Sequence, residues 1–272
     1  MLTTKLWLLL KYIILGTVQG LTEPLPVSSS GHMIILRHLF KVKMSGLSFE
    51  IFVNMASLCA ILLVYRKDLI RLIKNVTRYF IMKNNKLKND TNYVILLMIA
   101  TAPTAIIGFL MENFINDLLG SIKTVGISLL ITAYALWIIR NLNGVKDDEN
   151  ITIKDAFIVG LAQSVALIPG ISRSGATLVA AMLLGMKKET ALRFSFLLYI
   201  PVSLGISIFS LGDIIHNHPV HLTSLPNIMA FITAFFASYF ALSWFIDIMK
   251  KGKLIYFSIY CVIIGSLVII FL

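Results

Sequence analysis

The sequence predicts an all-α integral membrane protein with six transmembrane helices and two re-entrant helix hairpins in an inverted-topology repeat. Three observations predict this class: the composition, the lengths of the apolar runs and the placement of basic residues. Of the 272 residues, 58% are hydrophobic and 14% are charged, and the mean hydropathy is +0.87. Soluble domains average about 45–50% apolar and about 25% charged residues. The composition excludes a disordered chain, a coiled coil and an ordinary cytosolic enzyme, and residues 1–272 are expected to form a single membrane domain.

Apolar runs of sufficient length define the expected spans, since crossing a bilayer takes about 20 residues. Six such runs occur, at 48–65, 91–111, 119–139, 191–212, 225–247 and 254–272. Two further apolar regions, 5–40 and 152–186, are interrupted in the middle by proline, glycine and serine. Each arm is shorter than a span, which favours a helix–turn–helix hairpin that enters and leaves the membrane on one side.

Basic residues predict the orientation of the chain. The net charge of +11 would suggest nucleic acid in a soluble protein, but cytoplasmic loops of membrane proteins retain Lys and Arg, so no nucleic-acid partner is expected. Segment 66–90 carries eight Lys and Arg residues and is expected inside the cell. The loop Glu112–Leu118 has none and is expected outside. This alternation places both termini and the first hairpin outside, and brings the second hairpin in from the cytoplasm.

An internal repeat agrees with this topology. At an offset of 144 residues, five identities relate the two hairpins: Gly16 with Gly160, Gln19 with Gln163, Ser28 with Ser172, Ser30 with Ser174, and Gly31 with Gly175. Each half, about 1–140 and 151–272, is a hairpin followed by three spans. Because three is odd, the halves must be inverted, and their polar turns can meet within the membrane. Chance similarity of small-residue loops is the alternative, but inverted repeats with broken helices typically mark a binding site near the midplane.

Three ionisable residues, Glu23, His32 and Arg173, interrupt the apolar hairpins, where such groups are costly and usually functional. Arg173 offers a planar fork that suits phosphate oxygens. Ser28 or Ser29, and likewise Ser172 in the second hairpin, can cap the following helix, whose free N–H groups then favour an anion. These features predict a phosphate site.

A metal ligand and a nucleophile are expected in the first hairpin. Gln19 and Glu23 share a helix face, and a carboxylate beside phosphate commonly holds Mg²⁺ or Ca²⁺. Ser29 and His32 are three residues apart, so a hydroxyl could face an imidazole. Structural alternatives stay open: Glu23 could pair with Arg173, and His32 could satisfy a buried carbonyl. The serines at 28, 30 and 174 are more typical of caps and helix packing than of nucleophiles.

Other polar and large residues carry weaker signals. Glu50, at the outer start of a span, is a secondary candidate for the site. The histidines at 216, 218 and 221 have metal-like spacing, but an external polar loop accounts for them as well. Four large residues are expected in the core: Met182, Met186, Phe194 and Phe196.

The stretches Gly16–His32 and Pro169–Thr177 resemble the two signature motifs of the bacitracin-resistance type of undecaprenyl-diphosphate phosphatase, and the similarity extends along the chain, including the Phe49-Glu50 and Arg193–Phe196 regions. The resemblance implies a multi-pass phosphatase of the bacterial plasma (inner) membrane. It would hydrolyse undecaprenyl diphosphate to undecaprenyl phosphate, the lipid carrier of peptidoglycan synthesis. The resemblance also implies a divalent cation, Mg²⁺ or Ca²⁺, and an active site facing the extracytoplasmic side.

Carried over by position, the residues that match the family's catalytic groups are Glu23, Ser29, His32 and Arg173. The expected substrate-binding set is Gln19, Ser28, Ser30, Ser172, Ser174 and Thr177. Two departures stand out: Gln19 replaces a glutamate found in some members, and Ser30 stands where threonine is frequent. Glu23 is therefore the expected metal ligand.

Several alternatives remain open on the sequence. Ser29, His32 or water could be the nucleophile. A lipid or small-anion transporter could use the same inverted repeat for alternating access, without needing a nucleophile and base. A structural membrane subunit would not need Glu, His and Arg at membrane depth. A homodimer is also left open.

Overall fold

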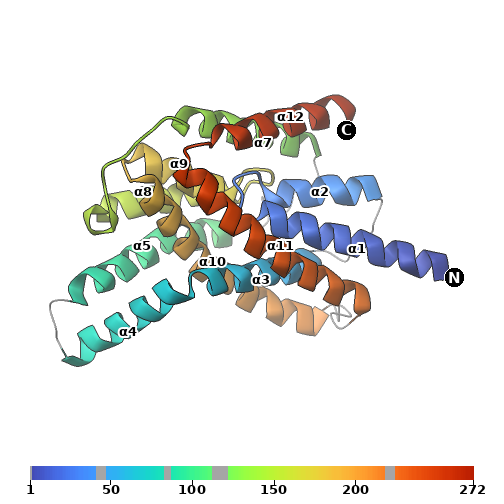
Figure 1. Cartoon of the computed structure of the whole chain (residues 1–272). Coiled ribbons are helices and arrows are strands. Elements are labelled where there is room, and N and C mark those ends of the chain that lie inside the picture. Colours follow the sequence, from blue (N-terminus) through green and yellow to red (C-terminus); the bar gives the residue numbers. More distant parts are fainter. Residues whose placement is uncertain (1, 41–46, 83–86, 112–121, 218–223) are drawn as a thin grey trace.

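Helices make up the fold over the residues that the computed structural model describes, which are 2–40, 47–82, 87–111, 122–217 and 224–272. This confirms the all-α class (Figure 1). The helices are α1 (Leu2–Thr22), α2 (Ser29–Phe40), α3 (Leu47–Val64), α4 (Arg66–Met82), α5 (Lys88–Leu110), α7 (Ile122–Ile139), η2 (Asp148–Asn150), α8 (Ile153–Val165), α9 (Arg173–Leu183), α10 (Lys188–Asn217), α11 (Leu225–Lys250) and α12 (Ile255–Phe271).

Long apolar helices identify a multi-pass membrane protein. Within the described ranges, α5, α7, α10 and α11 are long and apolar enough to cross a membrane. Helix α3 would make a fifth span together with α4, although the pair is bent by 73° at Tyr65. Helix α12 is apolar but has 17 residues. The six-span arrangement with two re-entrant hairpins therefore stays a prediction.

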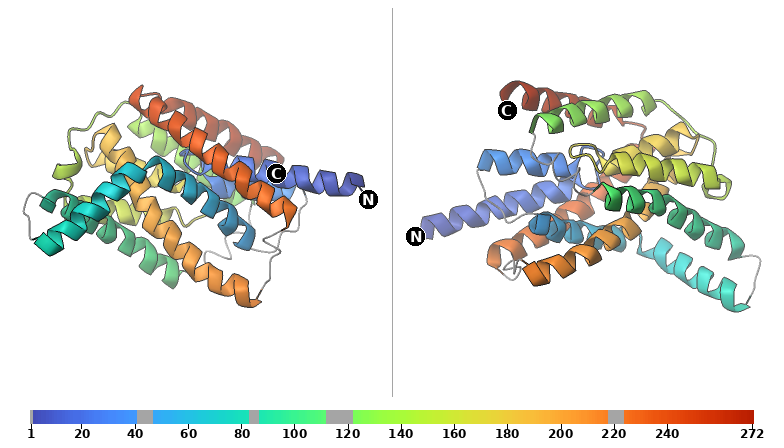
Figure 2. Two further views of the ribbon diagram at one scale, coloured as in Figure 1. Left: turned by 60° about the horizontal axis from the view of Figure 1, so that its bottom comes forward. Right: turned by 180° about the vertical axis from the view of Figure 1, so that it is seen from behind.

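Local sequence ends and begins the broken helices where the turns require it. Helix α1 ends at Thr22, just before Pro24 and Pro26, because proline removes a backbone donor and restricts the preceding residue. Helix α8 begins with a capping box in which Thr152 and Asp155 satisfy each other's backbone N–H. The chain between these helices and their partners, α2 and α9, is irregular and lies near the middle of the molecule (Figure 2).

Glycines allow two pairs of helices to approach closely. A Cβ on Gly16 of α1 would lie 2.2 Å from the carbonyl oxygen of Ala230 in α11. In the second half, a Cβ on Gly160 of α8 would lie 2.2 Å from the carbonyl oxygen of Ala100 in α5. Lipid provides no hydrophobic driving force for one helix to associate with another, so helices in a membrane are held together largely by close packing, which small residues permit. The first arm of each hairpin is thereby held against a long helix.

The buried core surrounds the second hairpin and α10. The residues expected there, Met182, Met186, Phe194 and Phe196, are all buried, which confirms that prediction. A smaller cluster joins α1, α2, α3 and α11 around Leu15. Helices α7 and α12 pack along one side, at the top of Figure 1. The hairpin turns are thus enclosed by helices from both halves of the chain.

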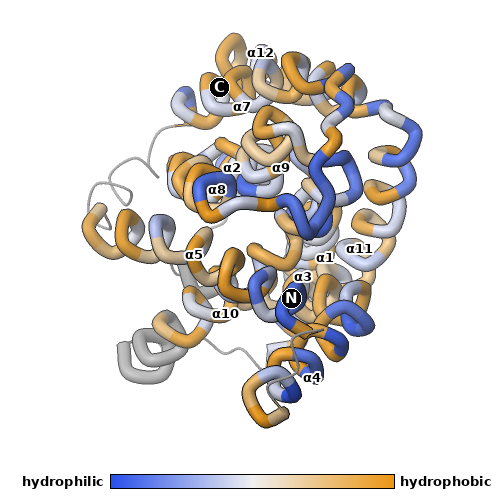
Figure 3. The backbone as a smooth tube through the Cα atoms, turned by 90° about the vertical axis from the view of Figure 1, so that its left-hand side faces the viewer, coloured by the Kyte–Doolittle hydropathy of each residue, from blue (hydrophilic) through white to orange (hydrophobic). Residues whose placement is uncertain are grey.

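Links that carry lysine and arginine share one end of the molecule. The end of α4, the start of α5 and the α7–α8, α9–α10 and α11–α12 links all lie toward the left in Figure 1. Seen from that side, hydrophilic segments gather at this end (Figure 3). Arg193, at the start of α10, binds Asp68 of α4 and Asp148 of η2 here. Burial raises the pKa of Asp148, while the Arg193 guanidinium opposes the shift. An ion-pair cluster therefore fixes α4 against α10 at the basic end.

Candidate active site

The turn of the first hairpin has an unusual backbone. Ser28 has a φ of 66°, the one positive value for a non-glycine residue in the described part of the chain. Residues with a side chain rarely adopt this conformation, which costs about 1–3 kcal/mol and clusters at functional sites. The Ser28 hydroxyl accepts a hydrogen bond of 3.2 Å from the N–H of Gly31 and so caps α2. This confirms the predicted cap.

The second turn caps its helix in the same way. The Ser172 hydroxyl accepts a hydrogen bond of 3.1 Å from the N–H of Gly175 and caps α9, as predicted. The N–H of Ser172 itself donates to Thr132 of α7 at 3.4 Å. The second helix of each hairpin therefore begins at its turn, and the free N–H groups of a first helical turn favour an anion.

Direct hydrogen bonds join the two turns. The Ser174 hydroxyl donates to the carbonyl oxygen of Leu25 at 3.1 Å. In the same direction, the N–H of Gly170 donates to the Ser30 hydroxyl at 3.5 Å, at the limit of a hydrogen bond. Ser30 and Ser174 are the pair matched by the sequence repeat, and each contacts the other turn. The expectation that the two polar turns meet is therefore confirmed.

Glu23 is the centre of the site. Its Oε1 accepts a hydrogen bond from Nη2 of Arg173 at 3.1 Å, which forms an ion pair between the two hairpins. Its Oε2 accepts from Nε2 of Gln19 at 2.9 Å and from the Ser29 hydroxyl. The Glu23 side chain is only 4% exposed. A carboxylate buried to this degree needs such partners, because an unpaired charge in an apolar interior is very costly.

Arg173 is held by residues of α10 and, through them, α3. Its Nη1 donates to the Ser203 hydroxyl at 3.2 Å, and its guanidinium lies 4.8 Å from the ring centre of Tyr199. The Tyr199 hydroxyl donates in turn to Asn54 at 3.1 Å. One end of the guanidinium fork therefore points toward Glu23 and the other toward Ser203, and these two contacts fix the plane of the guanidinium. This fixed plane is what bidentate contact with phosphate oxygens requires.

His32 does not bond to Ser29 in this structure. Its Nδ1 lies 2.7 Å from the carbonyl oxygen of Ser28, and its Nε2 lies 2.7 Å from the hydroxyl of Tyr260 in α12. The spacing of Ser29 and His32 predicted a hydroxyl–imidazole pair, but the Ser29 hydroxyl donates to Glu23 instead. The predicted Ser29–His32 pair was wrong for this structure. The fold brings the Glu23 carboxylate within hydrogen-bond distance of Ser29 at the start of α2, which the spacing of residues in the sequence does not reveal.

The expected substrate-binding residues all lie in the hairpins. Gln19, Ser28, Ser30, Ser172 and Ser174 make the contacts given above. Thr177 is buried, and its hydroxyl donates to the carbonyl oxygen of Arg173, one turn earlier in α9, at 3.1 Å.

Other candidates lie outside this cluster. Glu50 pairs with Arg37 of α2 rather than with the site. The side chains of the histidines at 216, 218 and 221 lie outside the described residues, so their suggested metal spacing has no structural counterpart here.

A divalent cation fits the site only together with phosphate. In the described part of the chain, no three His, Cys, Asp or Glu side chains converge to form a metal cage. Glu23 offers one carboxylate and Ser29 a hydroxyl oxygen beside it. Mg²⁺ commonly binds one or two carboxylates plus substrate phosphates and keeps several waters. The donor set therefore suits a cation that arrives with a phosphorylated ligand.

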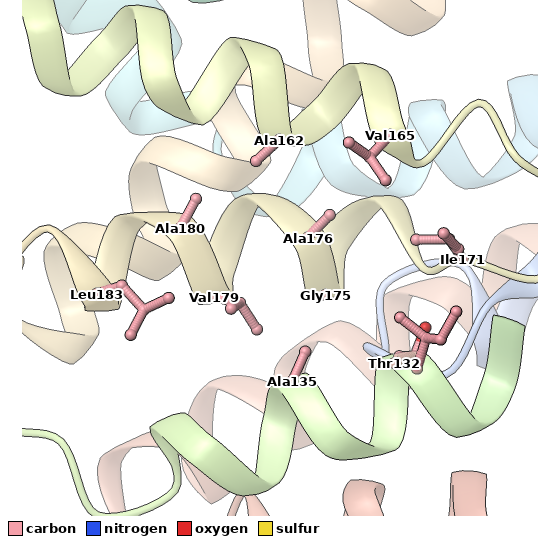
Figure 4. Close-up of a pocket in the computed structure, with 11 residues that line it drawn as sticks. Thr132, Ala135, Ala162, Val165, Ile171, Gly175, Ala176, Val179, Ala180 and Leu183 are labelled. Carbon is pink, nitrogen blue, oxygen red and sulfur yellow. The ribbon is translucent and has the colours of Figure 1, made fainter.

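An apolar cavity of about 270 Å³ lies beside the second hairpin, between α7, α8 and α9 (Figure 4). Small and branched side chains line it, including Ala135, Ala162, Ala176 and Val179. It reaches Ile171, the residue before the Ser172 cap. An apolar hollow thus borders the turn that carries Arg173.

Comparison with known proteins decides the family. Residues 12–267 match the family model described as bacitracin resistance protein BacA. The chain belongs to the BacA family. A protein of Bacillus thuringiensis named undecaprenyl-diphosphatase 2 is 57% identical to this BacA-family chain, covering 98% of the chain and 99% of the relative. Undecaprenyl-diphosphatase of Oceanobacillus iheyensis is 56% identical over 98% of both, and undecaprenyl-diphosphatase 1 of Halalkalibacterium halodurans is 51% identical over 97% of both.

Sequence reasoning missed four site residues of this BacA-family chain: Asn54, Tyr199, Ser203 and Tyr260. Asn54 and Ser203 carried a usable signal, since polar groups in the middle of an apolar run usually face the bundle interior. Tyrosines in apolar runs carry little signal, because they are equally at home in a core or at a membrane interface. Only the packing of α10 and α12 against the hairpins identifies the two tyrosines.

The backbone of Ser28 generates a stability prediction. Ser28→Ala should lose the cap and retain the strain of a positive φ, so stability should fall by about 0.5–2 kcal/mol or slightly more. Ser28→Gly should cost only a few tenths of a kcal/mol, since glycine tolerates this φ. Thermal unfolding in one detergent would compare the two variants.

Ser172 provides the matched control for this prediction. It makes the equivalent cap at a φ of −73°, so glycine relieves no strain there. The Ala-to-Gly difference should be larger at Ser28 than at Ser172. Equal differences at the two positions would mean that the Ser28 backbone is not strained.

Proposed function

We propose that this chain hydrolyses undecaprenyl diphosphate to undecaprenyl phosphate and inorganic phosphate. The product is the lipid carrier used in peptidoglycan synthesis, and its recycling would confer resistance to bacitracin. The observation that carries the proposal is the convergence of Arg173, two helix N-termini and a Ser29–Glu23 pair at one point between the hairpins. The names and high identity of the BacA-family relatives support the same substrate.

Phosphate binding follows from the charges of the site. Arg173 and the N–H groups at the starts of α2 and α9 would hold the diphosphate and stabilise charge that develops on the transferred phosphoryl group. The ion pair with Glu23 orients the guanidinium before the substrate arrives. Such preorganised donors cost no rearrangement during the reaction, which is the main source of their catalytic effect.

Ser29 is the nucleophile that the geometry favours. Its hydroxyl already donates to Glu23, so the carboxylate can accept the proton as the Ser29 oxygen bonds to the terminal phosphorus. The bond between that phosphorus and the bridging oxygen breaks, and undecaprenyl phosphate leaves. Water then hydrolyses the phosphoserine and releases phosphate. His32 would assist as acid or base, whereas direct attack by His32 or by water is the competing mechanism.

A transporter of lipids or small anions is the second candidate function, because the hairpins meet between two halves of the chain. The Ser29–Glu23 contact favours hydrolysis, since a carrier needs a phosphate site but no hydroxyl held against a carboxylate. A carrier would move the lipid diphosphate across vesicles without releasing phosphate.

Phosphate release by the purified protein tests the function. The parent chain should release phosphate from undecaprenyl diphosphate. Ser29→Ala should lower turnover by roughly 1,000-fold or more while retaining lipid binding. Arg173→Lys should lose about 100- to 1,000-fold, since an ammonium cannot reproduce the fork.

The exposed Ser243→Ala on α11 is the control for this experiment and should be unchanged. Near-normal turnover of Ser29→Ala would transfer the nucleophile role to His32 or water. A parent protein that binds the lipid but releases no phosphate would favour the transporter.

We also propose that Mg²⁺ or Ca²⁺ takes part, bound to Glu23 and to the substrate phosphates. The cation would neutralise phosphate charge and polarise the phosphoryl oxygens. Excess chelator should abolish turnover, and added Mg²⁺ or Ca²⁺ should restore it. Glu23→Gln should raise the cation concentration required for half-maximal turnover. Full activity in chelator would restrict Glu23 to its roles as base and as partner of Arg173.

For the membrane arrangement, we propose six spans and two re-entrant hairpins in inverted halves, about 1–140 and 151–272. The matching contacts of Gly16 and Gly160 support inverted halves. The shared end of the basic links supports the predicted orientation, with the active site open to the extracytoplasmic side of the bacterial inner membrane.

Cysteine labelling of whole cells tests this orientation. In a chain without Cys59 and Cys261, Lys5→Cys should react with an impermeant reagent, whereas Lys74→Cys in α4 should react only after permeabilisation. Both positions are exposed on the protein, so burial within the protein does not distinguish them. Labelling of Lys74→Cys in intact cells would contradict the inverted topology. The homodimer stays a prediction, which the mass of the detergent-solubilised protein would decide.

A further inference from the structure

His32 is bonded at both ring nitrogens to parts of the chain distant from each other. Nδ1 lies 2.7 Å from the Ser28 carbonyl oxygen, and Nε2 lies 2.7 Å from the Tyr260 hydroxyl. The His32 and Tyr260 rings stack at 5.6 Å between centres with 11° between their planes. His32 is buried at 8% exposure. The orientation of the imidazole is therefore determined by the strained turn on one side and by the last helix on the other.

These contacts determine which nitrogen carries the proton. A carbonyl oxygen can only accept a hydrogen bond, so Nδ1 must be protonated to bond Ser28. The neutral imidazole then has its lone pair on Nε2, and the Tyr260 hydroxyl donates to it. The same Ser28 carbonyl also accepts the backbone N–H of His32 at 3.2 Å, so the ring contact is made at the first turn of α2.

We propose that Tyr260 is a positioning residue for His32 in the hydrolysis of the lipid diphosphate. Its hydroxyl donates to Nε2 and holds the plane of the imidazole, while the Ser28 carbonyl fixes the Nδ1–H tautomer, so that unprotonated Nε2 is the atom able to exchange a proton during the reaction. The inference rests on the proposed function and on participation of His32 in it. It adds α12, which packs along α7, to the catalytic arrangement.

Comparison of two tyrosines on α12 tests the role. Tyr260→Phe should lower kcat by about 10- to 100-fold with little change in KM, by analogy with the loss of a partner that orients a metal-bound histidine. Tyr256→Phe lies one turn earlier on the same helix, exposed beside Lys253, and should be unchanged. An equal loss in both variants, or a loss confined to the amount of folded protein, would indicate a structural role and overturn the proposal.

Coupling to His32 separates positioning from general destabilisation. In a His32→Gln background, which is itself expected to be slow, Tyr260→Phe should lower kcat no further, since residues that act as a unit are not additive. A full additional loss would overturn the proposal. A parent enzyme that releases no phosphate would instead contradict the proposed function. An active His32→Gln variant would overturn the inference alone.

Nitrogen chemical shifts give a readout independent of activity. The chain has five histidines, so ¹⁵N-histidine labelling with His32→Gln as the assignment reference is practicable. The parent should show protonated Nδ1 and unprotonated Nε2 at His32. Tyr260→Phe should keep the Nδ1–H tautomer, because the Ser28 carbonyl fixes it, but the Nε2 signal should shift, because Nε2 loses its hydrogen-bond donor. An Nε2 chemical shift that is the same in Tyr260→Phe as in the parent would contradict the role of Tyr260.

Discussion

The ion pair between Glu23 and Arg173 is the contact on which the rest of the site depends. It joins two hairpins whose paired residues are 150 positions apart, and the Glu23 side chain is almost wholly buried. An unpaired charge within an apolar bundle is costly, so each partner offsets the cost of burying the other. The pair therefore brings the guanidinium fork of Arg173 next to a carboxylate that already accepts a hydrogen bond from the Ser29 hydroxyl.

The surrounding helices show how two irregular turns can exist inside an apolar bundle. Backbone groups within a membrane must find partners in the protein. Here serine hydroxyls supply them: Ser28 and Ser172 cap the two helices, and Ser174 reaches across to the other turn. Glycine contacts hold the first arm of each hairpin close to a long helix. The first-turn N–H groups of α2 and α9 that remain free are the donors that the proposed phosphate site would use, so the features that stabilise the turns also suit that proposal.

Ser29 and His32, the two candidate nucleophiles of the first hairpin, have different hydrogen-bond partners. Ser29 bonds the carboxylate of Glu23, whereas His32 bonds a backbone carbonyl and Tyr260. In the proposed mechanism, proton removal from Ser29 and proton exchange at His32 therefore involve separate groups. The BacA family assignment agrees with hydrolysis. The apolar cavity beside α9 shows that a hydrophobic surface borders the polar turns, as a lipid diphosphate with a long chain would require.

The sequence by itself determined the helical membrane class, the two broken segments and the residues Glu23, Ser29, His32 and Arg173, because charged groups and turn residues are too costly within apolar runs to occur there without a site or a break. It also identified the caps, which depend on neighbours three residues away. Only the tertiary structure decided which of these residues are hydrogen-bonded to each other. Ser29 bonds Glu23 rather than His32, and Asn54, Tyr199, Ser203 and Tyr260 join the site from helices far along the chain. Local spacing places residues on one helix face, but contacts between helices depend on how closely glycines and small residues let the helices approach.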